Sequence, residues 1–133
     1  MGQLYYCVDI KLLMMEKQNY FEKALAWVQS RGFDQIKANV DGYDMPKRFL
    51  KAEDEEEAMV PDITGLKRGK KNYIEIALKT DRVRRRVTKW KLLDKLSHIK
   101  GGKLYLLAPY GHKSFAERIV KRYGLEAQIV SLN

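Results

Sequence analysis

The stretch from Lys103 to Pro109 constrains the fold of this chain more than any other segment. Its residues are almost all apolar, which is typical of a strand that is covered on both faces. Residues 81–99 before it repeat apolar residues at helical spacing, and the glycines Gly101 and Gly102 end that helix. A further helix is predicted over residues 113–123. A buried strand between two helices indicates an α/β protein in which helices cover the sheet.

The remaining predicted elements include one further helix and four strands. A helix is predicted from Lys11 to Arg31, and Gly32 ends it. The segment Gln3 to Val8 before it is expected to be a short strand or an extended arm. Strands are predicted at residues 35–43, 58–64, 73–80 and 127–132. The sequence therefore predicts one domain over residues 1–133, an α/β sandwich with a mixed central sheet and the order αβββαβαβ.

Positive charge is concentrated in one part of the chain. Residues 67–103 hold fourteen lysines and arginines against three acids, whereas the remainder holds twelve against fourteen. The whole net charge of +9 therefore arises in this segment. A basic stripe attracts polyanions, of which nucleic acid is the commonest in a cell. A solvated helix face that only improves solubility is the alternative explanation.

The remaining composition indicates the compartment. The chain has one cysteine, Cys7, which cannot form a disulfide framework or a paired-cysteine zinc site. Residues 1–17 lack the order of a secretory signal, and the longest apolar runs are too short to cross a bilayer. A cytoplasmic protein without a membrane role is expected.

Two carboxylates stand out against this background. Asp62 follows Pro61 at the middle or end of the second predicted strand, and Glu75 lies within the third. If the Gly- and Lys-rich residues 67–72 close a hairpin, the two acids lie on adjacent antiparallel strands and can share one face. Two buried carboxylates repel each other and are costly to desolvate, so a divalent cation between them would explain the pair. Magnesium prefers one or two carboxylates together with water and phosphate oxygens.

These residues carry a family resemblance. Pro61-Asp62, then Glu75 with a basic residue further along the strand, within an αβββαβ order, resembles the PD-(D/E)XK superfamily of restriction-endonuclease-like nucleases. The resemblance covers roughly residues 18–109. It implies a restriction-endonuclease-like α/β/α sandwich and magnesium-dependent cleavage of DNA, with manganese as a substitute metal. It also implies Asp62 and Glu75 as catalytic metal ligands, together with the backbone carbonyl of Ile76.

The chain departs from the family pattern at one position. The family's lysine stands two residues after the glutamate, where this chain has Ala77. Lys79 lies on the same strand face but about 6.5 Å further along, and it is the first candidate for the catalytic ammonium group. Lys89 or Lys91 on the following helix is the second. The third alternative is that the lysine is lost and the site binds without cleaving.

Further candidates surround this motif. Glu22 on the first helix resembles an additional acid that some members of the superfamily place near the metal, although an exposed helical glutamate is the ordinary alternative. Basic residues of the hairpin and of the following helix are expected to contact phosphates, which position a nucleic acid without reading its sequence. They are Lys67, Arg68, Lys70, Lys71, Arg82, Arg85, Arg86, Lys89 and Lys91.

Three functions thus remain open from the sequence. The first is a metal-dependent nuclease that acts on DNA, for which small members of this fold often form homodimers because one site cuts one strand. The second is a catalytically inactive nucleic-acid-binding module of the same fold. The third is a basic adaptor that binds an acidic protein partner.

Overall fold

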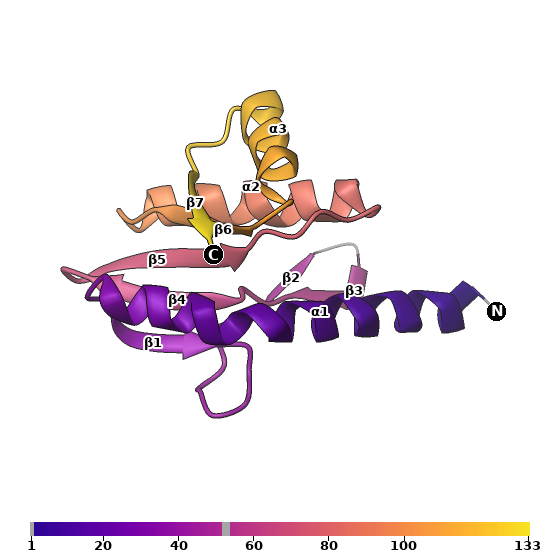
Figure 1. Cartoon of the computed structure of the whole chain (residues 1–133), viewed down its shortest axis with the longest axis horizontal. Coiled ribbons are helices and arrows are strands. Elements are labelled where there is room, and N and C mark those ends of the chain that lie inside the picture. The colour runs from indigo at the N-terminus through magenta and orange to yellow at the C-terminus, as the bar shows by residue number, and fades with distance from the viewer. Residues whose placement is uncertain (1, 52–53) are drawn as a thin grey trace.

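The computed structural model describes the backbone of residues 2–51 and 54–133, and the side chains of residues 16–49 and 59–133. Figure 1 shows a long first helix beneath a sheet and two further helices above it. The elements in chain order are α1 (Gly2–Ser30), β1 (Asp34–Ala38), β2 (Phe49–Lys51), β3 (Asp54–Met59), β4 (Ile63–Lys67), β5 (Lys70–Ile76), α2 (Val83–Ile99), β6 (Leu104–Pro109), α3 (Lys113–Tyr123) and β7 (Gln128–Leu132).

Five strands form the central sheet in the order β1-β4-β5-β6-β7. The pairs β1–β4 and β4–β5 are antiparallel, whereas β5–β6 and β6–β7 are parallel. The strands β2 and β3 form a separate antiparallel pair inserted between β1 and β4. The predicted α/β class, mixed sheet and order αβββαβαβ are therefore confirmed, with this small pair as an addition.

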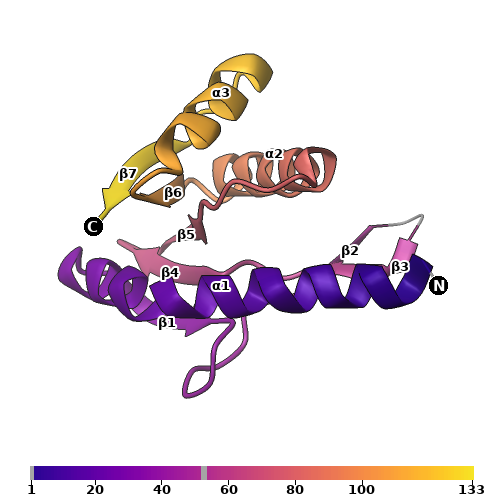
Figure 2. The same ribbon diagram turned by 45° about the vertical axis from the view of Figure 1, so that its right-hand side comes forward.

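Two hydrophobic clusters cover the two faces of the sheet. On one face, α1 contributes Phe21, Ala24, Leu25 and Val28, which pack with Ile74 and Ile76 of β5. On the other face, α2 and α3 pack over Tyr73 of β5 and over Leu104 and Leu106 of β6. Figure 2 shows α1 on the opposite side of the sheet from α2 and α3. The apolar strand β6 is buried because helices cover it from both sides, as its composition predicts.

Several predicted boundaries were wrong, among them that of the strand predicted over residues 73–80, which runs from Lys70 to Ile76. Residues 3–8 belong to α1 and form neither a strand nor an extended arm, since each residue added to an existing helix gains a hydrogen bond. The strand predicted over residues 58–64 is two strands, because β3 ends at Met59 and β4 begins at Ile63. Pro61 lies between them, and its missing N–H prevents a continuous ladder. The strand predicted over residues 35–43 ends at Ala38.

No helix among the described residues is both long enough and apolar enough to span a bilayer.

The turn between β4 and β5 fixes the register that matters for the site. Arg68 and Gly69 both have positive φ angles, 54° and 76°, as a two-residue type I′ hairpin turn requires. The register that follows places Ile63 opposite Ile74. Asp62 therefore comes beside Glu75 at the far end of the hairpin.

Candidate functional site

Asp62 and Glu75 meet at the end of the β4–β5 hairpin, as the hairpin prediction required. The Asp62 N–H donates to Oε2 of Glu75 over 2.6 Å, and the Ile76 N–H donates to Oδ2 of Asp62 over 2.9 Å. Asp62 is 3% exposed and Glu75 is 0% exposed. Each carboxylate is thus oriented by a backbone amide, and both are removed from solvent.

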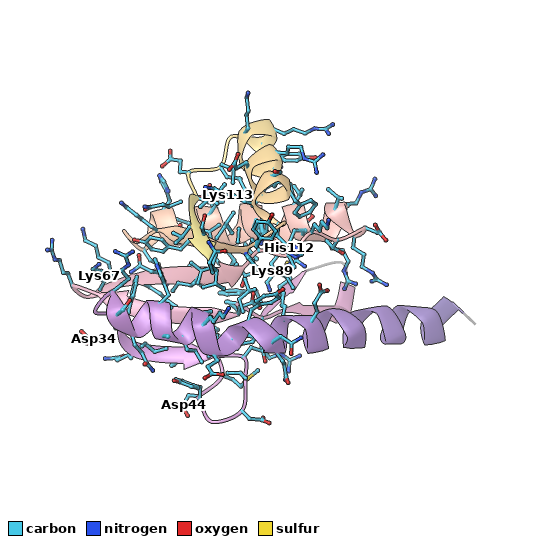
Figure 3. The ribbon with its side chains drawn as sticks, viewed as in Figure 1. Asp34, Asp44, Lys67, Lys89, His112 and Lys113 are labelled. Atoms are coloured by element: carbon cyan, nitrogen blue, oxygen red, sulfur yellow. The ribbon has the colours of Figure 1, made fainter. Side chains whose placement is uncertain are left out.

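Two lysines from different helices neutralise these acids. Lys17 of α1 places its Nζ atom 3.1 Å from both carboxylate oxygens of Asp62. Lys89 of α2 places its Nζ atom 2.9 Å from Oε1 of Glu75 and 3.8 Å from Oδ1 of Asp62. One ammonium group therefore lies within ion-pair distance of both carboxylates. Figure 3 marks Lys89 in this region, between the sheet and α2.

A third cation, Arg86, lies one turn before Lys89 on α2. Its guanidinium is over the Trp90 ring, 5.7 Å from the centroid, and the residue is buried. Its positive charge acts on Asp62, Lys17 and Lys89. The two carboxylates are therefore under the influence of three cations, two of which, Lys17 and Lys89, lie at ion-pair distance from them.

Burial and the neighbouring opposite charges act in opposite directions on the pKa values of Asp62, Lys17 and Lys89. Burial alone would raise the pKa of Asp62, but Lys17, Lys89 and the Ile76 N–H hold that pKa at about 2. Burial lowers the pKa of Lys17 to about 8, although Asp62 opposes the shift. For Lys89 burial also acts to lower the pKa, but Glu75 and Asp62 together raise it. At neutral pH Asp62 is ionised and Lys89 is protonated, while Lys17 titrates closest to neutrality.

The low pKa of Asp62 predicts an acid-sensitive contribution to stability. The folded-state pKa is about 2 against an ordinary value of 3.8, so the unfolded chain takes up the proton first as the pH falls. The contribution is complete above about pH 4 and is lost towards pH 2, a loss of about 2 kcal/mol. We expect urea unfolding to show this extra loss in the natural protein relative to Asp62→Asn. Parallel pH profiles for the two proteins would contradict the assignment.

The structure does not bring Lys79 or Glu22 to the carboxylates. Lys79 is exposed, and its backbone N–H donates to Nδ1 of His112 over 2.9 Å. Within the described part of the chain, its ammonium forms no ion pair with Asp62 or Glu75. Glu22 is exposed on α1. The position of the family's lysine, Ala77, is fully buried in the cluster beneath α2.

The predicted phosphate contacts fall into two groups. Arg86 and Lys89 point into the carboxylate cluster, whereas the others lie nearer to the surface. Lys67, Arg68, Lys70 and Lys91 are exposed, while Lys71, Arg82 and Arg85 are partly buried. Burial lowers the pKa of Lys71, and the nearby Lys100, Lys37 and Lys47 lower it further. The hairpin tip and the outer face of α2 therefore carry the exposed part of the basic stripe.

Sequence reasoning missed Lys17, although a signal was present. Lys17 occupies the same helical stripe as Phe21, Ala24 and Val28, all of which are buried. In the same way, Arg86 shares the buried stripe of Trp90 and Leu93 on α2. A cation on the apolar stripe of a helix indicates a buried acid opposite it, because an unpaired buried charge is costly.

Asp62 and Glu75 are candidate ligands for a metal ion. Among the described residues, no group of three or more histidine, cysteine, aspartate or glutamate side chains could hold a metal ion. Magnesium needs only one or two protein carboxylates when water and phosphate supply the other ligands. In this structure the oxygens of Asp62 and Glu75 are held by the ammonium groups of Lys17 and Lys89, so a magnesium ion at the same oxygens would have to displace them.

Comparison with protein-family models, curated proteins and solved structures finds no match to this chain.

Proposed function

We propose that this protein is a magnesium-dependent nuclease of the PD-(D/E)XK type that cleaves DNA, with Lys89 in place of the family's strand lysine. The observation that carries the proposal is the position of Lys89 between Glu75 and Asp62, 2.9 Å and 3.8 Å from their oxygens. An acidic pair on adjacent strands with an ammonium group between them supplies the residue types that the chemistry needs. In this proposal the ammonium group comes from Lys89 on α2, and not from a lysine at the position of Ala77.

Each side chain has a distinct role in this proposal. Asp62 and Glu75 would hold the magnesium ion, with the Ile76 carbonyl as the third ligand that the family resemblance implies. The bound ion would polarise the phosphodiester and lower the pKa of an attacking water. Lys89, which now lies between the two carboxylates, would then neutralise a phosphate oxygen. Lys17 keeps the Asp62 carboxylate ionised and oriented from the α1 side.

The basic surface supports DNA as the substrate. The hairpin tip with Lys67, Arg68, Lys70 and Lys71 and the helix α2 with Arg82, Arg85 and Lys91 supply phosphate contacts in this proposal. Such contacts give an affinity that falls steeply with salt and carries no sequence preference. A cytoplasmic location and a homodimer, in which two sites cut the two strands, complete the proposal.

Plasmid nicking tests the function and the role of Lys89 together. We expect nicking with magnesium or manganese, none with EDTA, and a loss of about 100-fold or more in Lys89→Met. Lys91→Met is the matched control. It lies two residues along the same helix, is exposed and has its ammonium over the Tyr123 ring, 5.5 Å from the centroid. We expect its rate to stay within about threefold, since a single phosphate contact contributes little.

Two controls separate a loss of activity from a loss of folding or of charge. Circular dichroism at the assay temperature shows that each variant is folded, and Lys89→Arg keeps the charge while changing the geometry. Equal losses in Lys89→Met and Lys91→Met would show that general charge, rather than the cluster, is responsible. Absence of nicking with either metal would contradict the nuclease.

One observation favours a second candidate, an inactive nucleic-acid-binding module. Lys17 and Lys89 already neutralise both carboxylates, so the cluster is stable without a metal. In that case we expect DNA binding that weakens steeply with salt and does not change when magnesium is added. Isothermal titration of the protein with magnesium alone separates the candidates, since only the nuclease requires the ion to compete with Lys89.

A further inference from the structure

A cavity lies at the other end of the sheet from the carboxylate cluster. Its volume is about 160 Å³, and its walls include Trp27, Arg31, Phe33, Lys67, Tyr105 and Gln128. Asp62 immediately precedes β4 and Lys67 ends it, so five residues of extended chain, about 17 Å, separate the two places. In Figure 3 the labelled Lys67 lies at the far end of the sheet from Lys89.

Three aromatic rings form one wall of this cavity. The Trp27 centroid is 5.4 Å from that of Tyr105 and 6.2 Å from that of Phe33, and Phe33 and Tyr105 are 5.9 Å apart. Phe33 is buried, whereas Trp27 and Tyr105 are only partly buried. The rings are held by α1, β6 and the segment between α1 and β1, so they form a rigid apolar surface that is open on one side.

Two cations border the same rings. The Arg31 guanidinium lies over Trp27, 5.3 Å from the ring centroid, and the Lys67 ammonium lies over Phe33 at 5.3 Å. Within the ranges that the structure describes, neither cation has an acidic side chain at ion-pair distance. Both positive charges are therefore available to an anion that enters between them.

Size and charge together select the ligand. A cavity of roughly 150 Å³ holds one benzene-sized ring, so the volume here suits a single planar ring. A free phosphate would make no contact with the aromatic rings. A neutral ring would leave the two cations without an anionic partner. A nucleotide has a ring that packs on aromatic side chains and a phosphate that pairs with arginine and lysine.

We propose that this cavity binds one nucleotide, with its base against Trp27 and Tyr105 and its phosphate between Arg31 and Lys67. The nucleotide is either free or an unpaired residue of a single strand, because the two present the same chemistry. The site shares Lys67 with the phosphate contacts of the proposed nuclease, but it shares no residue with the carboxylate cluster and needs no metal.

Tryptophan fluorescence and calorimetry without magnesium test the proposal on the natural protein. The chain has two tryptophans, and Trp90 is fully buried in the other cluster, so ligand quenching reports on Trp27. The probes are a deoxynucleoside monophosphate, the nucleoside, inorganic phosphate and a short single-stranded oligothymidylate. We expect the monophosphate to quench and to bind at least about tenfold more tightly than the nucleoside or phosphate alone.

Variants of the basic residues show whether the monophosphate binds in this cavity. Arg31→Ala is expected to weaken monophosphate binding by about fivefold or more. Arg122→Ala is the matched control, because its guanidinium also lies over an aromatic ring, that of Tyr123 at 5.7 Å, but away from the cavity. Lys67→Ala is the second test variant and lies at the exposed end of β4.

Each outcome decides the proposal. Tighter binding of the oligothymidylate supports the site as a strand contact, and equal binding supports it as a free-nucleotide site. Equal binding of phosphate and monophosphate would overturn it, because the rings would then contribute nothing. Equal losses in Arg31→Ala and Arg122→Ala, or no quenching at millimolar monophosphate, would also overturn it.

Discussion

Replacing Glu75 with glutamine is expected to lower magnesium-dependent cleavage by about 1,000-fold or more. A metal that stabilises charge in the transition state contributes several kcal/mol, and each 1.36 kcal/mol is a factor of ten in rate. Glutamine keeps the size of the side chain, and its amide oxygen still accepts from the Asp62 N–H, which now bonds to Oε2 of Glu75. The change therefore removes the charge that would hold the ion and leaves the local backbone in place. Asp62→Asn is expected to act in the same direction.

The matched control for Glu75→Gln is Glu117→Gln. Glu117 lies on α3 and is exposed, so its replacement removes the same charge from the chain without touching the cluster. The measurement is the initial rate of plasmid nicking, together with magnesium affinity from calorimetry. If Glu75→Gln kept the nicking rate and the magnesium affinity, the carboxylate pair would have no part in the mechanism.

The largest effect on stability is expected from Lys89→Met. This variant leaves Glu75, which is fully buried, without the cation 2.9 Å away. Removing one partner of a buried ion pair typically costs about 3–5 kcal/mol, because the remaining charge is uncompensated. Lys89→Met/Glu75→Gln removes both charges, so we expect the double variant to be more stable than Lys89→Met alone.

A double-mutant cycle measures this coupling. The free energy of unfolding is obtained from urea denaturation of the natural protein, the two single variants and the double variant. We expect a coupling energy of about 2–3 kcal/mol, which is within the range for residues in one ion-pair network. Additive effects of the two changes would show that Lys89 and Glu75 do not stabilise each other, and the arrangement of the cluster would then be wrong.

The parts of the fold that follow from local pattern could be predicted from the sequence. The helix over residues 113–123 and the apolar strand ending at Pro109 are found where they were expected. The hairpin prediction placed Asp62 beside Glu75, because the side chains of a strand alternate and the turn sets the register. Lys89, which lies at these carboxylates, was named only with Lys91 as the alternative to Lys79 for the ammonium group.

The other part of the candidate site depends on contacts between distant segments. Lys17 reaches Asp62 across 45 positions of the chain, and no local pattern specifies which acid a helical lysine will meet. The division of residues 58–64 into two strands also escaped prediction, because the β2–β3 pair draws one half away from the central sheet. Lys79 was favoured by strand alternation, but β5 ends at Ile76, so alternation no longer governs its direction.

The span of 45 positions between Lys17 and Asp62 also bears on how the molecule assembles. A contact of such long sequence separation forms only after the intervening strands have been arranged, and such contacts slow folding. Until α1 docks, Asp62 lacks Lys17, one of the groups that lower the pKa of its carboxyl group. The proton affinity of this one side chain therefore depends in part on whether the first helix has joined the sheet.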